Sequence, residues 1–218
     1  MKTNSEVIKG LYAITDEGLT QEELPGKTRL AIHGGAAIIQ YRNKTTDQHQ
    51  RIQQVHTLLS LCKQHHVPLI INDDTMLAKT TAANGVHLGR DDASIQQARA
   101  ALGSQAIIGV SCYNDLQRAI TAQRLGADYV AFGSFFPSST KPDTVCAPID
   151  LLRRAKRKLS IPVVAIGGIT PDNAAMLIDA GADAVAVIHG LFGQNDVLAA
   201  AADYAKLFSE QRYRVAVK

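Results

Sequence analysis

Short runs of apolar, often β-branched residues alternate along the chain with longer stretches whose apolar residues recur at helical spacing. The short runs are apolar throughout rather than at every second position, which is typical of strands buried on both faces of a sheet. They span residues 11–15, 37–41, 68–71, 86–88, 106–111, 129–132, 162–166 and 184–188. The pattern therefore predicts a parallel sheet covered by helices.

Helix boundaries are indicated by residues that commonly cap helix ends. Helices are expected to begin at Asp47, at Asp74 or Thr75, and at Ser94, Asn114, Asp150, Pro171 and Asp196, with the last one running to Phe208. Three helix exits share a glycine close to the next strand. Gly85, Gly126 and Gly181 are predicted to take the left-handed conformation that ends a helix.

The count of these elements decides between two architectures. Eight strand–helix pairs follow one another at a spacing of roughly 20–35 residues, which favours a closed parallel (β/α)8 TIM barrel. An open, doubly wound sheet is the alternative, but no G-x-G-x-x-G follows the first strand. We find no linker or change of composition, so we expect residues 1–218 to form a single α/β barrel domain.

Composition narrows the class of protein. The 218 residues are 46% hydrophobic and 20% charged, as in ordinary globular proteins. The net charge is 23 − 20 = +3 and the basic run at 153–158 has no interleaved aromatics, so we expect no nucleic-acid or membrane partner. The opening MKTNSEVIKG is not a signal peptide, and no apolar run is long enough to span a membrane. Three cysteines without a C-x-x-C indicate a reducing compartment, the cytoplasm.

Polar residues gather where the predicted strands end, and in a (β/α)8 barrel the active site lies at those carboxyl ends. Gln40, Arg42 and Lys44 alternate with Tyr41 and Asn43, so the first three share one face of an extended segment. The other strand-end residues are Asn72, Asp73 and Asp74, then Arg90, Asp91 and Asp92, then Ser111, and finally Ser138, Ser139, Thr140 and Lys141. Carboxylates on neighbouring strand ends suit Mg²⁺, and cations around them suit a diphosphate.

A second phosphate site is indicated after the seventh strand. Gly167 and Gly168 precede a helix that starts near Thr170 and Pro171, and bare backbone amides at a helix N-terminus bind phosphate. In barrels of this kind a phosphate often lies between the loops after strands seven and eight. The mouth is therefore predicted to accept a metal-bound diphosphate and a monophosphate.

Each of these residues also has a purely structural interpretation. Asp73 or Asp74, and Asp91 or Asp92, would serve equally as helix caps, and the glycine pair as a turn. His33 is expected at a helix end and His65–His66 in a surface turn. We interpret His87, inside the fourth strand, as a packed and hydrogen-bonded residue rather than a general base.

The segments LYAIT, IIQYRNK, PLIINDD, GVHLGRDD, IGVSCYN, ADYVAFGSFFPSSTKPD, IPVVAIGGIT and GADAVAVIHGLF follow in this order from Leu11 to about Phe192. Together they resemble the thiamine phosphate synthase family, which is a (β/α)8 barrel. The resemblance implies a transferase that joins hydroxymethylpyrimidine diphosphate to thiazole monophosphate, or to its carboxylated form. In the reaction that the resemblance implies, pyrophosphate departs with the help of Mg²⁺, and the thiazole nitrogen then attacks the cationic pyrimidine methylene to give thiamine phosphate.

Carried over by motif position, the resemblance implies a role for each strand-end residue. Asp73 and Asp92 would hold Mg²⁺, with Asp74 and Asp91 as second choices. Arg42, Lys44, Ser111 and Lys141 would act on the diphosphate as catalytic residues, with Asn72 beside them and Gln40 at the pyrimidine. Ser138, Thr140, Gly168, Ile188 and His189 would bind the thiazole phosphate. The family often has Thr at position 138 and usually has Ser at position 189, so the contact made by the His189 side chain departs from its pattern.

Other functions remain open from the sequence. A related barrel that isomerises a thiazole phosphate would need no diphosphate site, so retention of Arg42, Lys44 and Asp92 argues against it. A phosphosugar isomerase or epimerase would need an acid–base pair on facing strands, and no convincing pair exists beyond His87. A non-catalytic binder of thiamine precursors has the same sequence features as the enzyme.

Overall fold

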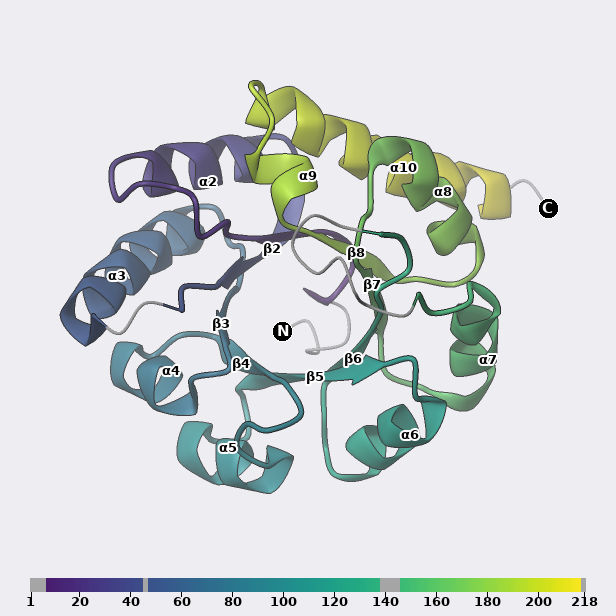
Figure 1. The fold of residues 1–218 in the computed structure, drawn as a ribbon, viewed down its shortest axis with the longest axis horizontal. Coiled ribbons are helices and arrows are strands. Elements are labelled where there is room, and N and C mark those ends of the chain that lie inside the picture. The colour runs from purple at the N-terminus through teal and green to yellow at the C-terminus, as the bar shows by residue number, and fades with distance from the viewer. Residues whose placement is uncertain (1–6, 45–46, 138–145, 217–218) are drawn as a thin grey trace.

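The computed structural model describes residues 7–44, 47–137 and 146–216, of which 212–216 are described by their backbone alone. Eight parallel strands pair in sequence order, and β1 also pairs with β8, so the sheet closes into a barrel (Figure 1). The predicted (β/α)8 barrel is confirmed. The strands are β1 (Gly10–Ile14), β2 (Ala36–Tyr41), β3 (Leu69–Asn72), β4 (Gly85–Leu88), β5 (Ile107–Tyr113), β6 (Tyr129–Phe132), β7 (Val163–Ile166) and β8 (Ala184–Val187).

A ring of helices surrounds the barrel, while the short α9 lies over its mouth beside the end of β8 (Figure 1). The helices are α2 (Glu23–His33), α3 (Gln48–Gln64), α4 (Thr75–Thr81), α5 (Ile95–Leu102), α6 (Leu116–Arg124), α7 (Asp150–Lys158), α8 (Pro171–Asp179), α9 (His189–Phe192) and α10 (Val197–Ala216). Within the described ranges, none of these helices has the length and apolarity needed to cross a membrane.

Side-chain caps fix most helix starts where the sequence predicts them. The carboxylate of Asp47 accepts the N–H of Gln50 at 2.9 Å, and Asp74 accepts that of Leu77 at 2.8 Å. One start is wrong by a residue: Asp115, rather than Asn114, caps α6.

The structure also corrects the predicted end of α4 and the predicted lengths of β5 and α10. Gly126 and Gly181 have φ of +92° and +110°, as expected. After α4, however, Ala82 takes the left-handed conformation and Gly85 belongs to β4. A Cβ at Gly85 would meet the carbonyl of Ile107, so the glycine serves strand packing instead of the helix end. Strand β5 continues past Ser111, and α10 continues past Phe208.

Two apolar layers hold the fold together. The larger one lies between the strands and the surrounding helices. The smaller one fills the barrel with inward-facing side chains from seven of the strands and with Ile8, which precedes β1 and is fully buried. A filled barrel leaves the carboxyl ends of the strands as the open face, which is where a site can form.

Candidate active site at the barrel mouth

Four predicted site residues share the inward side of their strands. Gln40, Asn72, Ser111 and Ile188 each follow, by two or four positions, a residue of the barrel interior. Side chains two apart on a strand lie on the same face, so these four point toward the mouth. The structure thus brings together residues that lie far apart in the sequence.

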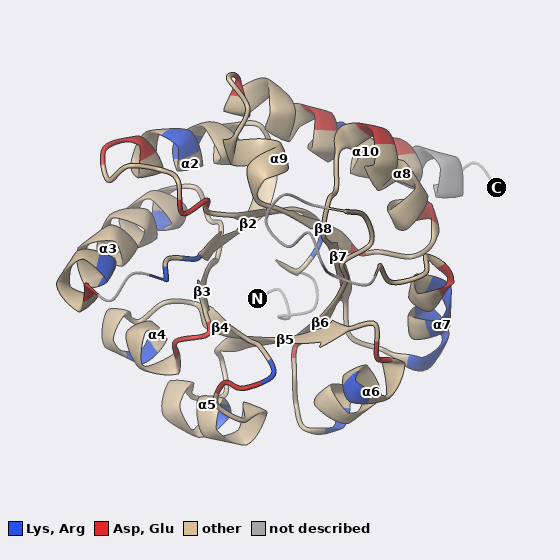
Figure 2. Cartoon of the chain, in the orientation of Figure 1, with Lys and Arg blue, Asp and Glu red and all other residues tan. Residues whose placement is uncertain are grey.

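The exit of β2 carries the cationic part of the mouth. The backbone of Arg42 is fixed by Thr15, whose hydroxyl accepts the Arg42 N–H at 2.9 Å and donates to its carbonyl at 3.2 Å. Its guanidinium pairs with Glu17 at 2.9 Å. Lys44 lies near enough to Asp73 to favour the ionised form of that carboxyl. Figure 2 shows this blue segment on the same side of the ring as the red segments that follow β3 and β4.

Two carboxyl groups meet where β3 and β4 end. Asp73 and Asp92 hydrogen-bond to each other, although the two residues come from different loops. Burial, the contact with Asp92 and the charge of Asp92 together raise the pKa of Asp73 to about 6. Asn72 donates to Asp73 at 2.6 Å, and Asp92 accepts the N–H of Gly89 at 2.5 Å. Asp73 itself has φ of +63°, a conformation that Asp tolerates better than most residues.

This carboxylate pair fits a magnesium ion by its donor chemistry. Mg²⁺ binds one or two protein carboxylates and fills its other positions with water and phosphate oxygens. A cation held by Asp73 and Asp92 would offset the charge of Asp92, which adds to burial in raising the pKa of Asp73. Among the described residues, Asp73 and Asp92 meet as a pair, and no group of three or more His, Cys, Asp or Glu residues gathers as a metal site.

The second-choice aspartates have structural surroundings. One oxygen of Asp74 caps α4, and the other pairs with Arg51 at 2.9 Å. Asp91 is exposed. The capping interpretation therefore holds for Asp74, and the carboxylate pair consists of Asp73 and Asp92.

Ser111 lies beside an irregularity in β5. The register with β6 shifts between Ser111 and Tyr113, and bulges of this kind often redirect side chains near active sites. Arg118 on α6 donates to the Ser111 carbonyl at 2.8 Å and to the Gly89 carbonyl at 3.0 Å. It thereby ties the β5 exit to the loop that carries Asp92.

The exits of β7 and β8 lie side by side. Gly168 has φ of +62°, and a Cβ there would meet the carbonyls of Phe136 and Pro137. A Cβ at Gly190 would meet the Ile169 carbonyl, so the predicted phosphate-binding segments around Gly168 and His189 are neighbours. The His189 side chain points elsewhere: its Nδ1 lies 3.2 Å from Asp16, and the side chain is 66% exposed.

The remaining predicted residues, Ser138, Ser139, Thr140 and Lys141, lie outside the described residues. The segment before them is anchored to β7, since the N–H groups of Phe135 and Phe136 donate to the carbonyls of Ile166 and Gly167, each at 3.1 Å. Phe135 is buried in the core.

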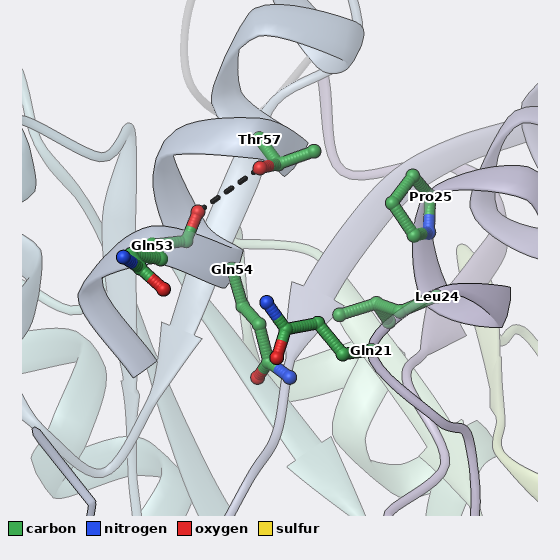
Figure 3. A pocket seen from close by; sticks show the side chains of 6 residues that line it. All are labelled: Gln21, Leu24, Pro25, Gln53, Gln54 and Thr57. Atoms are coloured by element: carbon green, nitrogen blue, oxygen red, sulfur yellow. Dashed lines mark hydrogen bonds between the residues drawn. The ribbon is translucent and has the colours of Figure 1, made fainter. Parts of the chain in front are cut away.

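Several contacts that shape the mouth have no sequence signal. Tyr41 and Asn43, between the mouth-facing residues of β2, both donate to Oε1 of Gln54 on α3, at 2.6 Å and 3.0 Å. Gln54 also lines a cavity of about 110 Å³ between α2 and α3, shown in Figure 3, which lies on the outer wall of the barrel. Arg118 and Gln54 were missed because their positions on helices indicate only exposure or packing.

The structure confirms the helix-end position of His33, the turn at His65 and His66 and the packing of His87. His33 is the last residue of α2, and its ring packs edge-on against that of His65 at 5.0 Å. His87 is 8% exposed and hydrogen-bonds at both ring nitrogens, to Tyr129 and Ser111.

A model of the thiamine monophosphate synthase family matches residues 11–191. The chain belongs to the thiamine monophosphate synthase family. The thiamine-phosphate synthase of Nitrosococcus oceani is 54% identical over 205 residues, which cover 94% of each chain. That of Nitrosospira multiformis is 52% identical over 206 residues, covering 94% of this chain and 88% of its own.

A solved structure agrees with these relatives. Thiamine phosphate pyrophosphorylase from Pyrococcus furiosus superposes with a TM-score of 0.82 at 34% identity, covering 93% of this chain and 96% of that one. Membership of the thiamine monophosphate synthase family makes this chain an enzyme of thiamine biosynthesis, a transferase, as the sequence motifs implied.

Proposed function

We propose that the barrel mouth joins hydroxymethylpyrimidine diphosphate to thiazole monophosphate, or to its carboxylated form, and releases pyrophosphate. The observation that carries this proposal is the meeting of Asp73 and Asp92 beside the cationic exit of β2. Family membership supplies the substrates, since thiamine-phosphate synthases are the relatives at about half identity. We further propose that residues 1–218 form one barrel domain that carries this whole activity.

The first step is the departure of pyrophosphate. The bond between the pyrimidine methylene and the diphosphate oxygen breaks, and both electrons leave with the oxygen. Arg42, Lys44 and Lys141 stabilise the negative charge on the departing group, and the Ser111 hydroxyl and Asn72 amide donate hydrogen bonds to it. The guanidinium of Arg42, which pairs with Glu17 at 2.9 Å, would exchange this carboxylate for the diphosphate.

Asp73 and Asp92 are proposed to hold Mg²⁺. When bound, the ion supplies Lewis-acid stabilisation to diphosphate oxygens. Asn72 keeps the Asp73 carboxyl oriented through its 2.6 Å hydrogen bond, and Gly89 does the same for Asp92. Arg118 ties the loop that carries Asp92 to the exit of β5, because it donates to the carbonyls of Gly89 and Ser111.

The second step forms the new carbon–nitrogen bond. The thiazole nitrogen donates its electron pair to the cationic methylene, so no protein nucleophile is needed and positioning accounts for most of the rate. Gln40 is proposed to hold the pyrimidine. Ser138, Thr140, Gly168, Ile188 and His189 are proposed to hold the thiazole phosphate, His189 through its backbone because its side chain is directed to Asp16.

We also propose that the protein works in the cytoplasm. The three cysteines are free thiols, as expected for the reducing cytoplasm. Small phosphorylated molecules are the partners that this mouth suits.

Pyrophosphate release tests the proposed function. The full chain is incubated with both substrates, with each substrate alone, and with both plus a chelator. We expect release, with thiamine phosphate as co-product, only when both substrates and Mg²⁺ are present. Release without the thiazole phosphate would show a hydrolase, and no release under any condition would overturn the proposal.

A further inference from the structure

An uninterrupted series of hydrogen bonds crosses the inside of the barrel. Gln40 Nε2 donates to Tyr12 at 2.8 Å, and the Tyr12 and Tyr129 hydroxyls lie 2.7 Å apart. The Tyr129 hydroxyl lies 2.9 Å from Nδ1 of His87, whose Nε2 lies 2.9 Å from Oγ of Ser111. We call these five side chains the interior chain. It links the residue proposed to hold the pyrimidine to one proposed to hold the diphosphate.

The three inner members have little freedom. Tyr12 and Tyr129 are at most 1% exposed, and His87 stacks on the Tyr129 ring with centroids 5.5 Å apart. Gly109 leaves room for this ring, because a Cβ there would meet it. Buried hydroxyls need partners, and here the partners are one another. A change at one end of the interior chain is therefore transmitted to the other end.

The donors and acceptors allow one consistent order when Gln40 donates. Tyr12 accepts from the Gln40 amide, so its own proton goes to Tyr129. The Tyr129 proton then goes to Nδ1 of His87, and the His87 proton must sit on Nε2 and point at Ser111. The Ser111 hydroxyl accepts that bond, so its proton is free to be donated toward the mouth.

The opposite order would present different groups at both ends. If the Gln40 carbonyl faced Tyr12, each hydroxyl would donate the other way and His87 would carry its proton on Nδ1. Ser111 would then donate to Nε2 and would have no proton for an anion. Gln40 would turn its NH₂ rather than its carbonyl outward.

His87 can carry only one ring proton in this setting. Burial lowers the pKa of His87 to about 4, so the ring is neutral near pH 7. A neutral imidazole has one donor and one acceptor, which is the property that makes the order directional.

We propose that the interior chain has the first of these two orders, and that its inner members are positioning residues which fix the groups that Gln40 and Ser111 present to substrate. Gln40 turns an amide carbonyl toward the pyrimidine, whose amino group donates to it. Ser111 turns a hydroxyl proton toward the anionic diphosphate. The identity of the ligand in this inference rests on the proposed function. The order of the hydrogen bonds is independent of that function.

The tautomer of His87 tests the order directly. Long-range ¹H–¹⁵N correlation spectra of the ¹⁵N-labelled full chain, at pH 7 to 8, distinguish a protonated from an unprotonated ring nitrogen. We expect the proton of His87 on Nε2. A proton on Nδ1 would overturn the proposal, whatever the enzyme assays show. The tautomer is measured without substrate, so a failure of the proposed function leaves this result intact.

Tyr129→Phe tests the role of the inner members. Removing its hydroxyl interrupts the interior chain at its middle without touching Gln40 or Ser111. We expect kcat/KM for the pyrimidine diphosphate to fall about tenfold, and KM for the thiazole monophosphate to stay within twofold. Tyr204→Phe is the matched control, since it also removes a buried hydroxyl, bonded to the Ile169 carbonyl at 2.9 Å. It should leave kcat/KM for the pyrimidine diphosphate within twofold.

A double-mutant cycle separates positioning from general loosening of the barrel. Once Ser111→Ala has removed the hydroxyl that Tyr129 orients, Tyr129→Phe can act only through Tyr12 and Gln40, so its further cost should fall from about tenfold to about threefold. Losses that multiply would overturn the proposal, and so would a Tyr129→Phe variant with wild-type kinetics. Thermal unfolding of each variant confirms that it is folded at the assay temperature.

Discussion

At the scale of single residues, the mouth contains an unfavourable contact between two carboxyls. Asp73 and Asp92 face each other half-buried, and the pKa of Asp73 is raised by burial and by Asp92. At pH 8, above the Asp73 pKa of about 6, the charge of Asp92 acts against the charged form of Asp73. The arrangement favours binding of a cation at the expense of stability.

Asp92→Asn should reveal this repulsion. The asparagine can still accept the Gly89 N–H, but it carries no charge. In a chelator at pH 8, we expect its free energy of unfolding to rise by about 1 kcal/mol, a figure reduced for solvent screening at a half-exposed pair. Pyrophosphate release should fall by at least a hundredfold. Unfolding by urea and the release assay measure the two effects.

Asp74→Asn is the matched control for that substitution. Asparagine keeps the cap on α4 but loses the charge that pairs with Arg51, so this change should lower stability and largely preserve activity. If Asp92→Asn destabilised the metal-free chain as Asp74→Asn does, the two carboxyls would not repel each other.

Gln54 on α3 fixes the segment at the end of β2. It holds Tyr41 and Asn43, so it fixes the pleat that turns Gln40 and Arg42 to the mouth. Gln54→Leu should raise KM for the pyrimidine diphosphate about fivefold and leave kcat within twofold, a loss typical of one or two hydrogen bonds. Steady-state kinetics measure the split.

Two further variants serve as controls for Gln54→Leu. Gln54→Glu keeps the accepting oxygen and should restore KM. Gln53→Leu changes the exposed neighbour on the same helix and should have no effect. Equal KM values for Gln54→Leu and the wild type would show that β2 holds its pleat without help from α3.

At the scale of elements, the loop after β7 has one allowed backbone path. Gly168→Ala should raise KM for the thiazole monophosphate at least tenfold, because a Cβ at φ of +62° would meet the Phe136 and Pro137 carbonyls. Gly126→Ala is the control: it has φ of +92°, but no atom lies within 4 Å of its added Cβ. Titration of each variant with the thiazole monophosphate gives the comparison.

A wild-type affinity in Gly168→Ala would remove this loop from the proposed phosphate site. A loss of similar size in Gly126→Ala would point instead to general strain, since that glycine lies at the opposite end of the barrel from the mouth.

The strands were predictable element by element, whereas some helix ends were not. Parallel strands buried on both faces read as apolar runs, and this signal is local. The exit of α4 depends on distant contacts: the Asn84 side chain accepts the N–H of Leu69 at 2.9 Å, and Gly85 packs on Ile107. Neither contact is visible from the residues around Gly85.

The site could be predicted as far as topology determines it. Gln40, Asn72 and Ser111 lie at strand ends, and closure of the barrel brings those ends together. The direction of a long side chain needs packing, which is why the contacts of Gln54 and of Arg118 and the pairing of His189 with Asp16 appear only in the structure.

At the scale of the whole molecule, stability should depend on pH through His87. Its pKa is about 4 in the folded chain because of burial, below the ordinary 6.5. The unfolded chain therefore takes up a proton first as the pH falls. The contribution of the neutral ring is present above pH 6.5 and is lost as the pH falls toward 4.

His87→Gln should remove this dependence. Between pH 7.5 and pH 5 we expect the wild type to lose about 2 kcal/mol more unfolding free energy than the variant. Tyr129 and Ser111 contact the ring, and Asp92 acts on it from a distance, so the difference between the two proteins isolates the histidine. Parallel pH profiles of the two proteins would contradict the assignment of a buried neutral ring.

The left-handed backbone at Asp73 restricts which sequences can preserve this enzyme. Asn and Gly are the residues that adopt such a φ at least cost, and both lack a carboxylate. Glu has the carboxylate, but its longer chain has no preference for that backbone and would place the oxygens farther out. A substitution at position 73 that keeps the turn loses the charge, and one that keeps the charge strains the turn. Aspartate is therefore the one residue that meets both requirements at this position.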